Sequence, residues 1–341
     1  MVEPVQPGQI YEVLPDGRWA MYMDASMTGT FGVCPQLFQY QYVRNLTPKG
    51  DRPWARDLGS WWSVVMEHTY GAMFQGKRLT GEELVSLALR IWNELNMEEL
   101  DKIHPKMYKE FGGKAGAVTM IAEYAERQLP IDYVNWKILA AEASFGRNRE
   151  VKIGETNKII LYWMGQPDLF VIANNSRVHP VDHKSISKID NFTHLKYKPH
   201  IQLPGYIIAA QIILKNMGYD LPVDRVVVNA CARTDSTDKK TGEQKRPRFK
   251  RFMIGYTQAE LEEWKVRRID QASRLREYFE SGRWPWNEYA CGNQWGRPCP
   301  FQQVDDKTPE TREIVLQANF MKRAAWIPGR TKKEEEVKVD S

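Results

Sequence analysis

The chain lacks the long apolar runs of membrane proteins. Its longest apolar stretch, Tyr206–Leu214, is interrupted by Gln211, whereas a helix needs roughly 20 apolar residues to cross a bilayer. The N-terminus has no basic start followed by an apolar run, so a secretory signal is not indicated. The sequence therefore predicts no membrane contact and a cytoplasmic location.

Cysteine is also scarce, with four in 341 residues. In a reducing compartment these thiols need not pair. No Cys-x-x-Cys pair occurs, which leaves a redox or zinc protein as the least supported function.

Internal repeats are absent, and the composition is that of an ordinary globular protein. Hydrophobic residues make up 42% of the chain and charged residues 27%, which excludes collagen-like or wholly disordered chains. The net charge of +5 permits contact with a polyanion but does not establish it, because clustering of charge decides such binding.

The periodicity of apolar residues predicts a mostly helical N-terminal third and a mixed region after it. Thr80 followed by Glu82 and Glu83 is typical of a helix start. The predicted helices cover Cys34–Tyr42, Trp61–Tyr70, Ala115–Arg127, Ile201–Met217 and Gln258–Ser281. The predicted strands cover Glu142–Ile153, Lys158–Trp163, Gln166–Ala173, Val178–Ser185, Val223–Ala232 and Phe249–Tyr256.

Two of these strands form a predicted hairpin, because residues 174–176 (Asn-Asn-Ser) favour a turn. A turn centred near residue 175 pairs residues whose numbers sum to about 350, which places Asp168 opposite Asp182 on one face. Lys184 shares that face, and His183 points to the other. An exposed Asp-Lys ion pair is the common alternative, but the apolar flanks favour a buried strand pair, where such charges are costly without a purpose.

The functional interpretation of this cluster is a metal site. Asp168 and Asp182 offer the oxygen ligands that Mg²⁺ or Mn²⁺ prefers. Lys184 would orient a metal-activated water or stabilise developing charge.

The motif Pro167-Asp168, followed by Asp182-x-Lys184, resembles the PD-(D/E)xK nuclease superfamily. Gln202 and Tyr206 match the Q-x-x-x-Y motif of its RecB-type branch and share one helix face at this spacing. Packing through Tyr206 and hydrogen bonding through Gln202 is the alternative for this pair. The resemblance implies that the five polar residues of these motifs are catalytic.

Cysteines near both ends extend the resemblance. Cys34-Pro35 is similar to the N-terminal segment of the branch, and Cys291 with Cys299-Pro300-Phe301 is similar to its C-terminal group. AddB-type, CRISPR-associated and phage relatives hold an iron-sulfur cluster with four cysteines. Here Asp305 stands at the last position, so either the ligands are Cys34, Cys291, Cys299 and Asp305, or the cluster is absent or labile. Cys231 is predicted to pack in the core.

A second departure concerns the family's Gly-x-x-x-His segment, whose histidine binds the metal. Gly59 leads here to Ser63, with Glu67 one turn later. His68 is about 140° away from Ser63 around the helix and is a poor substitute. The metal would then rely on water and on three protein groups: Asp168, Asp182 and the main-chain carbonyl of His183. Glu142 is either a further ligand or a surface carboxylate.

Basic residues cluster in Lys245–Phe252, which reads KRPRFKRF. Such a run is usually a solvated loop, but beside a phosphodiesterase site it predicts a clamp on DNA phosphates. The clamp residues are Lys245, Arg246, Arg248, Lys250 and Arg251. Among the 12 Trp, Trp284, Trp286 and Trp295 either stack on single-stranded bases or pack around the C-terminal cysteines.

The patterns predict an α/β fold with a helical N-terminal region, and the resemblance implies a PD-(D/E)xK restriction-endonuclease-like core with a mixed sheet flanked by helices. The expected organisation is an irregular segment 1–30, a single nuclease domain 31–305, a helix over 306–330 and a disordered tail 331–341. Within the domain, the core covers about 138–256, the helical insertion about 60–137 and the cysteine segment 284–305.

The resemblance implies a metal-dependent DNA nuclease, most simply an exonuclease of phage or bacterial recombination, repair or genome processing. DNA is the expected partner, with unidentified recombination or replication proteins. The alternative is a DNA-binding or assembly protein on a decayed nuclease fold. Intact Asp168, Asp182 and Lys184 argue against decay.

Overall fold

The computed structural model describes residues 9–50, 54–105, 111–141, 151–165, 167–173, 177–198, 200–232, 247–293 and 298–325. Contacts divide the chain into two compact units. The terminal unit contains both chain ends and comprises Met1–Asp51, Arg147–Gly165 and Gln258–Ser341. The central unit comprises Arg52–Gly146 and Gln166–Thr257.

The central unit is built on a five-stranded mixed sheet with the order β10-β9-β8-β7-β4. β8 and β9 run parallel, and the other neighbours are antiparallel. In chain order the strands are β4 (Trp136–Ala141), β7 (Leu169–Ala173), β8 (Arg177–Ile186), β9 (Arg225–Ala232) and β10 (Arg248–Gly255).

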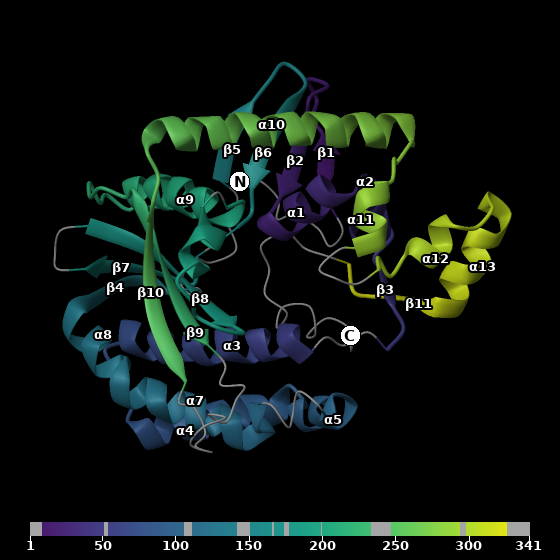
Figure 1. The fold of residues 1–341 in the computed structure, drawn as a ribbon. Coiled ribbons are helices and arrows are strands. Elements are labelled where there is room, and N and C mark those ends of the chain that lie inside the picture. The colour runs from purple at the N-terminus through teal and green to yellow at the C-terminus, as the bar shows by residue number, and fades with distance from the viewer. Residues whose placement is uncertain are drawn as a thin grey trace. The chain divides into compact units, whose positions relative to one another are not determined.

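Helices cover both faces of this sheet, with α9 on one side and α3, α4 and α7 on the other (Figure 1). α4 begins as predicted, because Thr80 and Glu83 form a reciprocal capping box that satisfies backbone N–H groups. The helical segments are α3 (Trp54–Phe74), α4 (Gly81–Glu94), α5 (Met97–Ile103), α7 (Gly113–Arg127), α8 (Leu129–Asn135), the 3₁₀ helix η3 (Thr193–Tyr197) and α9 (Gln202–Asn216).

The core of the central unit lies between the sheet and α3, α4 and α7. Trp61, Trp62 and Trp92 are fully buried there. Residues of four strands join them, including Val181 of β8 and Cys231 of β9, which confirms the predicted core position of Cys231. Because strand side chains alternate, Asp182 and Lys184 must leave β8 on the face that α9 covers.

The terminal unit has a four-stranded sheet with the order β1-β2-β6-β5, against which α10 packs through β5 and β6 (Figure 1). β2 and β6 run parallel, whereas β1 and β5 are antiparallel to their neighbours. The elements are β1 (Tyr11–Val13), β2 (Trp19–Met23), α1 (Ala25–Val33), α2 (Pro35–Phe38), the π-helix η1 (Gln39–Val43), β3 (Leu46–Pro48), β5 (Val151–Glu155), β6 (Ile159–Trp163), α10 (Gln258–Ser281), α11 (Glu288–Asn293), α12 (Gln302–Asp305), α13 (Pro309–Asn319) and β11 (Phe320–Lys322).

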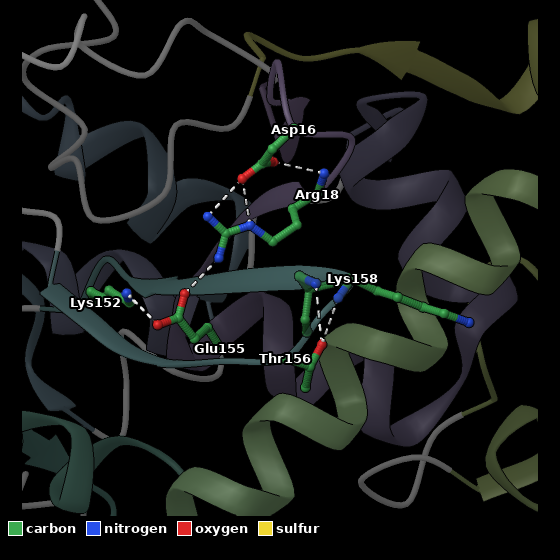
Figure 2. A network of polar contacts seen from close by, with 7 residues as sticks. Asp16, Arg18, Lys152, Glu155, Thr156 and Lys158 are labelled. Atoms are coloured by element: carbon green, nitrogen blue, oxygen red, sulfur yellow. Dashed lines mark hydrogen bonds and ion pairs between the residues drawn. The ribbon is translucent and has the colours of Figure 1, made fainter.

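A surface network joins the tips of this sheet (Figure 2). Arg18 pairs with Asp16 and with Glu155, each at 2.7 Å, and Lys152 pairs with the same Glu155 at 2.9 Å. The Thr156 hydroxyl accepts a hydrogen bond from the Lys158 backbone in the β5–β6 turn. Arg18 is partly exposed and its partners are exposed, so we expect these pairs to contribute little to stability.

Two predicted segments were wrong. Residues 1–30 are not irregular throughout, because β1, β2 and the start of α1 lie within them. The helix predicted for 306–330 ends at Asn319, since Phe320–Lys322 pairs with β3. The single domain 31–305 stays a prediction, and the tail 331–341 lies outside the described residues. No described helix is both long and apolar enough to cross a membrane.

Candidate active site

The hairpin of β7 and β8 has the predicted register. Leu169 pairs with Val181, and the Asp168 N–H donates to the Val181 carbonyl at 3.0 Å. The Asp168 carboxylate accepts a hydrogen bond from the His183 N–H at 2.5 Å. Asp168 therefore lies beside the Asp182–Lys184 stretch, as the turn predicted.

Lys184 lies at the centre of the polar cluster. Its Nζ is 3.0 Å from Oδ2 of Asp182 and donates a 3.2 Å hydrogen bond to Oε1 of Gln202. The Gln202 amide in turn donates to the Tyr206 hydroxyl, one turn further along α9. The structure thus brings together the five residues that the motifs indicated, from β8, α9 and the residue before β7.

The charges of this cluster set its chemistry. Burial alone would lower the pKa of the Lys184 ammonium, but the carboxylates of Asp182 and Asp168 outweigh it and raise that pKa above its ordinary value. Lys184 is therefore a cation at neutral pH and not a general base. Asp182 is 2% exposed, and its Oδ2 accepts no hydrogen bond from the described residues apart from its ion pair with Lys184.

Sequence reasoning missed two residues near this cluster, Tyr197 and His200. Burial raises the pKa of the Tyr197 phenol, and the charge of Asp182 adds to it. Burial lowers the pKa of His200, with Lys184 acting in the same direction. Both residues lie in the connection between β8 and α9, so their closeness in sequence to Gln202 was the available signal.

The side chain of His183 points away from the two aspartates. Its ring stacks on Tyr70 with centroids 5.0 Å apart, and its Nδ1 is 3.0 Å from Nδ2 of Asn229. Burial, with the charges of Arg251 and Lys184, lowers the pKa of His183 to about 3. A metal contact from this residue would have to use its main-chain carbonyl, as predicted.

A family model described as the PD-(D/E)XK nuclease superfamily matches residues 25–304. This chain belongs to the PD-(D/E)XK nuclease superfamily. Among solved structures, it is similar to a putative exonuclease from Eubacterium rectale, at 13% identity and a TM-score of 0.38. That match covers 84% of this chain and 94% of the other. Among curated proteins none matches.

Nucleases of this superfamily typically use Mg²⁺ or Mn²⁺, and the donor set here suits such ions. Two carboxylates converge, and the buried Oδ2 of Asp182 has no polar partner among the described residues besides Lys184. Mg²⁺ is held by one or two carboxylates with several waters, so a larger protein cage is not required. Within the described ranges, no three or more His, Cys, Asp and Glu are grouped to hold a metal ion.

The remaining ligand candidates do not extend this set. Ser63 and Glu67 lie on α3 and are partly exposed. His68 lines a surface pocket between α3 and α4. Glu142 lies outside the described residues.

The basic strand β10 divides its charges between two environments. Arg248 and Lys250 are exposed, and the Lys250 ammonium lies 5.1 Å from the centroid of the Phe252 ring. Arg251 turns inward, where its guanidinium is 2.5 Å from Oδ1 of Asp132. Its charge is thus paired within the protein. Lys245 and Arg246 lie outside the described residues.

The cysteines of the terminal unit share one buried cluster. Cys34, Cys291 and Cys299 pack together with Phe301 and Phe320. Burial, with the charges of Cys299 and Cys34, raises the pKa of Cys291 to about 11. Asp305 is 9% exposed and accepts a 2.9 Å hydrogen bond from the Tyr40 hydroxyl. The predicted ligand candidates therefore lie in one region of the terminal unit.

The tryptophans near these cysteines differ in burial. Trp284 packs in an aromatic cluster with Phe38 and Phe279. Trp286 is 47% exposed. Trp295 lies outside the described residues.

Proposed function

We propose that this protein is a metal-dependent deoxyribonuclease that hydrolyses phosphodiester bonds. The observation that carries the proposal is the convergence of Asp168, Asp182 and Lys184 on one sheet face, with Gln202 bonded to the lysine. Two oxygen donors beside a fixed cation match the needs of a reaction that builds negative charge on a phosphate.

Each residue has a distinct part in the proposed reaction. Asp168 and Asp182 hold the metal, which polarises the phosphodiester and acidifies a bound water when present. Lys184 stays protonated and stabilises the charge that develops on the phosphate oxygens. Gln202 accepts from the Lys184 ammonium and so restricts its position. Tyr206 accepts from the Gln202 amide and holds it in that orientation.

The finer proposal is an exonuclease that acts from DNA ends in phage or bacterial recombination, repair or genome processing. Exposed Arg248 and Lys250 are the described residues of the basic run that could contact DNA phosphates. A DNA-binding protein on a decayed nuclease fold is the second candidate. It is supported by Ser63 and Asp305, which replace residues typical of the family. The three residues Asp168, Asp182 and Lys184, which we call the acid-lysine cluster, are intact and favour the enzyme.

The test uses linear and circular DNA, single- and double-stranded and labelled at one end where linear, with Mg²⁺ or Mn²⁺. Wild-type protein should degrade linear DNA, and an exonuclease should leave circles intact. Asp182→Asn should lose at least about 10³-fold in rate, because this carboxylate is proposed to hold the metal that polarises the phosphodiester. Asp220→Asn, which changes an exposed aspartate of the central unit, is the matched control.

Two outcomes would contradict this proposal. Activity that survives both Asp182→Asn and Lys184→Ala would refute the site. DNA binding without cleavage by the wild type, in either metal, would favour the decayed-nuclease alternative.

We also propose that Cys34, Cys291, Cys299 and Asp305 hold an iron-sulfur cluster. Three thiols and a carboxylate lie in one buried region of the terminal unit, which is the support for this ligand set. Among the described residues they are not grouped closely enough to hold a metal ion, so binding would have to draw them together. Four thiolates are the usual set. Anaerobically purified protein should be brown and contain iron, and Cys299→Ser should lose both, whereas Cys231→Ala should keep them. Asp305→Cys should make the cluster more stable to air. Colourless, iron-free wild type would exclude the cluster.

A further inference from the structure

A ring of buried polar side chains lies behind the proposed site in the central unit. Its members are Tyr70 of α3, Tyr124 of α7, Asp132 of α8, Asn229 of β9 and Arg251 of β10. Four of the five are nearly inaccessible, and only Arg251 keeps some exposure, at 23% of its side chain. Each contacts the next, so the five residues form a closed circuit that we call the buried ring.

Each contact of the buried ring has a definite direction. The Tyr70 hydroxyl donates to Oδ2 of Asp132 at 2.5 Å, so it must accept from the Tyr124 hydroxyl at 2.6 Å. Tyr124 accepts from Nδ2 of Asn229 at 2.7 Å. Arg251 closes the circuit through its ion pair with Asp132 and a 3.4 Å hydrogen bond to Oδ1 of Asn229.

These directions determine the state of His183. An arginine can only donate, so the amide atom of Asn229 that faces Arg251 must be its oxygen. The Nδ2 group of Asn229 then has one hydrogen for Tyr124 and one for Nδ1 of His183, 3.0 Å away. The His183 ring is therefore a neutral acceptor at Nδ1, held by Asn229 on its edge and by Tyr70 on its face.

The position of His183 in β8 connects the buried ring to the proposed active site. His183 pairs with Asn229 in the ladder between β8 and β9. Its neighbours in sequence are Asp182 and Lys184, which project from the opposite face. The His183 N–H also donates to the Asp168 carboxylate at 2.5 Å. A shift of residue 183 would therefore move all three groups of the acid-lysine cluster.

We propose that the buried ring positions the metal site, and that Asn229 acts as a positioning residue through His183. This inference rests on the proposed function, since it concerns the same site. Residues that orient metal ligands from behind typically contribute about 10- to 100-fold to metal affinity. A ring that only stabilised the fold would leave metal affinity unchanged in a variant that still folds.

The experiment compares Asn229→Leu with Cys231→Ala in the full-length protein. Cys231 lies on the same strand face, two residues further along β9, and is equally buried but outside the ring. Both substitutions remove core contacts, so both should lower the melting temperature. Calorimetric titration with Mn²⁺, without DNA, then separates positioning from stability.

We expect Asn229→Leu to weaken Mn²⁺ binding about 10-fold or more and to lower kcat at saturating metal. Cys231→Ala should stay within about twofold of wild type in Mn²⁺ affinity. If Asn229→Leu does not fold, Tyr124→Phe replaces it, because it removes only the hydroxyl that joins Asn229 to Tyr70. A smaller change in the same direction is expected for Tyr124→Phe.

Two failures are distinguishable. If the wild type binds Mn²⁺ and cuts DNA, and the ring variant matches Cys231→Ala in Mn²⁺ affinity and kcat, the positioning role is overturned alone. If the wild type neither binds Mn²⁺ nor cuts DNA, the proposed function is overturned, and the inference falls with it.

Discussion

The two faces of β8 treat their polar groups in different ways. On the face covered by α9, the buried Oδ2 of Asp182 has no polar partner among the described residues other than the Lys184 ammonium at 3.0 Å, and Lys184 is one-third exposed. On the other face, His183 contacts Asn229, whose amide oxygen and both amide hydrogens are engaged. Nε2 of His183 is itself buried and has no hydrogen-bond partner among the described residues. Neighbouring residues of one strand thus enter a charged, partly exposed cluster on one face and the buried ring on the other.

This difference assigns ligand binding to one face of β8 and structural support to the other. The charged cluster reaches solvent through Lys184, so an external ligand can approach it, whereas the buried ring is closed to solvent apart from Arg251. The buried ring makes the opposite face rigid, because loss of any of its members leaves another buried polar group unsatisfied. The comparison predicts that changes on the first face affect rate more than stability, and that changes on the second face affect stability together with metal affinity.

The largest expected effect is on the α9 face. Lys184→Met should reduce kcat about 10²- to 10³-fold, because a fixed cation beside the developing charge is lost. The melting temperature should also fall, because the buried carboxylate of Asp182 loses its ion pair, but by less than for a fully buried pair, since Lys184 is one-third exposed. DNA degradation at saturating Mg²⁺ and thermal melting would measure the two. A large loss of stability with a small loss of rate would reverse the comparison.

The next effect is on the buried ring. Arg251→Met leaves the carboxylate of Asp132 buried without its counter-ion, so the free energy of unfolding should fall by about 3 kcal/mol. Urea denaturation of the full chain measures this change. Arg248→Met is the control, because Arg248 lies exposed on the same strand and should change stability by less than about 0.5 kcal/mol. Equal losses of unfolding free energy in the two variants would show that the ion pair of Arg251 with Asp132 does not stabilise the protein.

A smaller effect should depend on pH. Burial lowers the pKa of His179 in β8 below its ordinary value of 6.5. The unfolded chain therefore binds this proton more readily than the folded protein. The free energy of unfolding should have its full value above about pH 6.5 and decrease as the pH falls below it. His179→Gln should make this decrease shallower, as measured by unfolding at several pH values. His194→Gln, at an exposed position, should leave the slope as it is.

The smallest expected effect concerns the exposed basic side chains of β10. Lys250→Ala should weaken DNA binding slightly and reduce the slope of log affinity against log salt by about 1. Stability and kcat at saturating DNA should not change, because Lys250 is exposed. Binding titrations in Ca²⁺ at several salt concentrations provide the measurement. An unchanged slope would remove Lys250 from the predicted DNA contacts.

Local patterns predicted much of the fold of the central unit. The turn near residue 175 predicted the register of β7 with β8, because strand side chains alternate with a period of two. The predicted helix Gln258–Ser281 of the terminal unit has the same bounds as α10. The prediction failed where strands depend on distant partners. β2 pairs with β6, which lies far along the chain, and no local sequence pattern predicts that pairing.

The sequence by itself determined which residues share a face of β8 and which motif they form, since spacing and a turn suffice for both. Only the tertiary structure decided that Arg251 turns inward to Asp132 and that five residues from five elements form one buried ring. The physical reason is the range of the interactions. Backbone periodicity acts over a few residues, whereas the partner of a buried charge is chosen by how whole helices and strands pack.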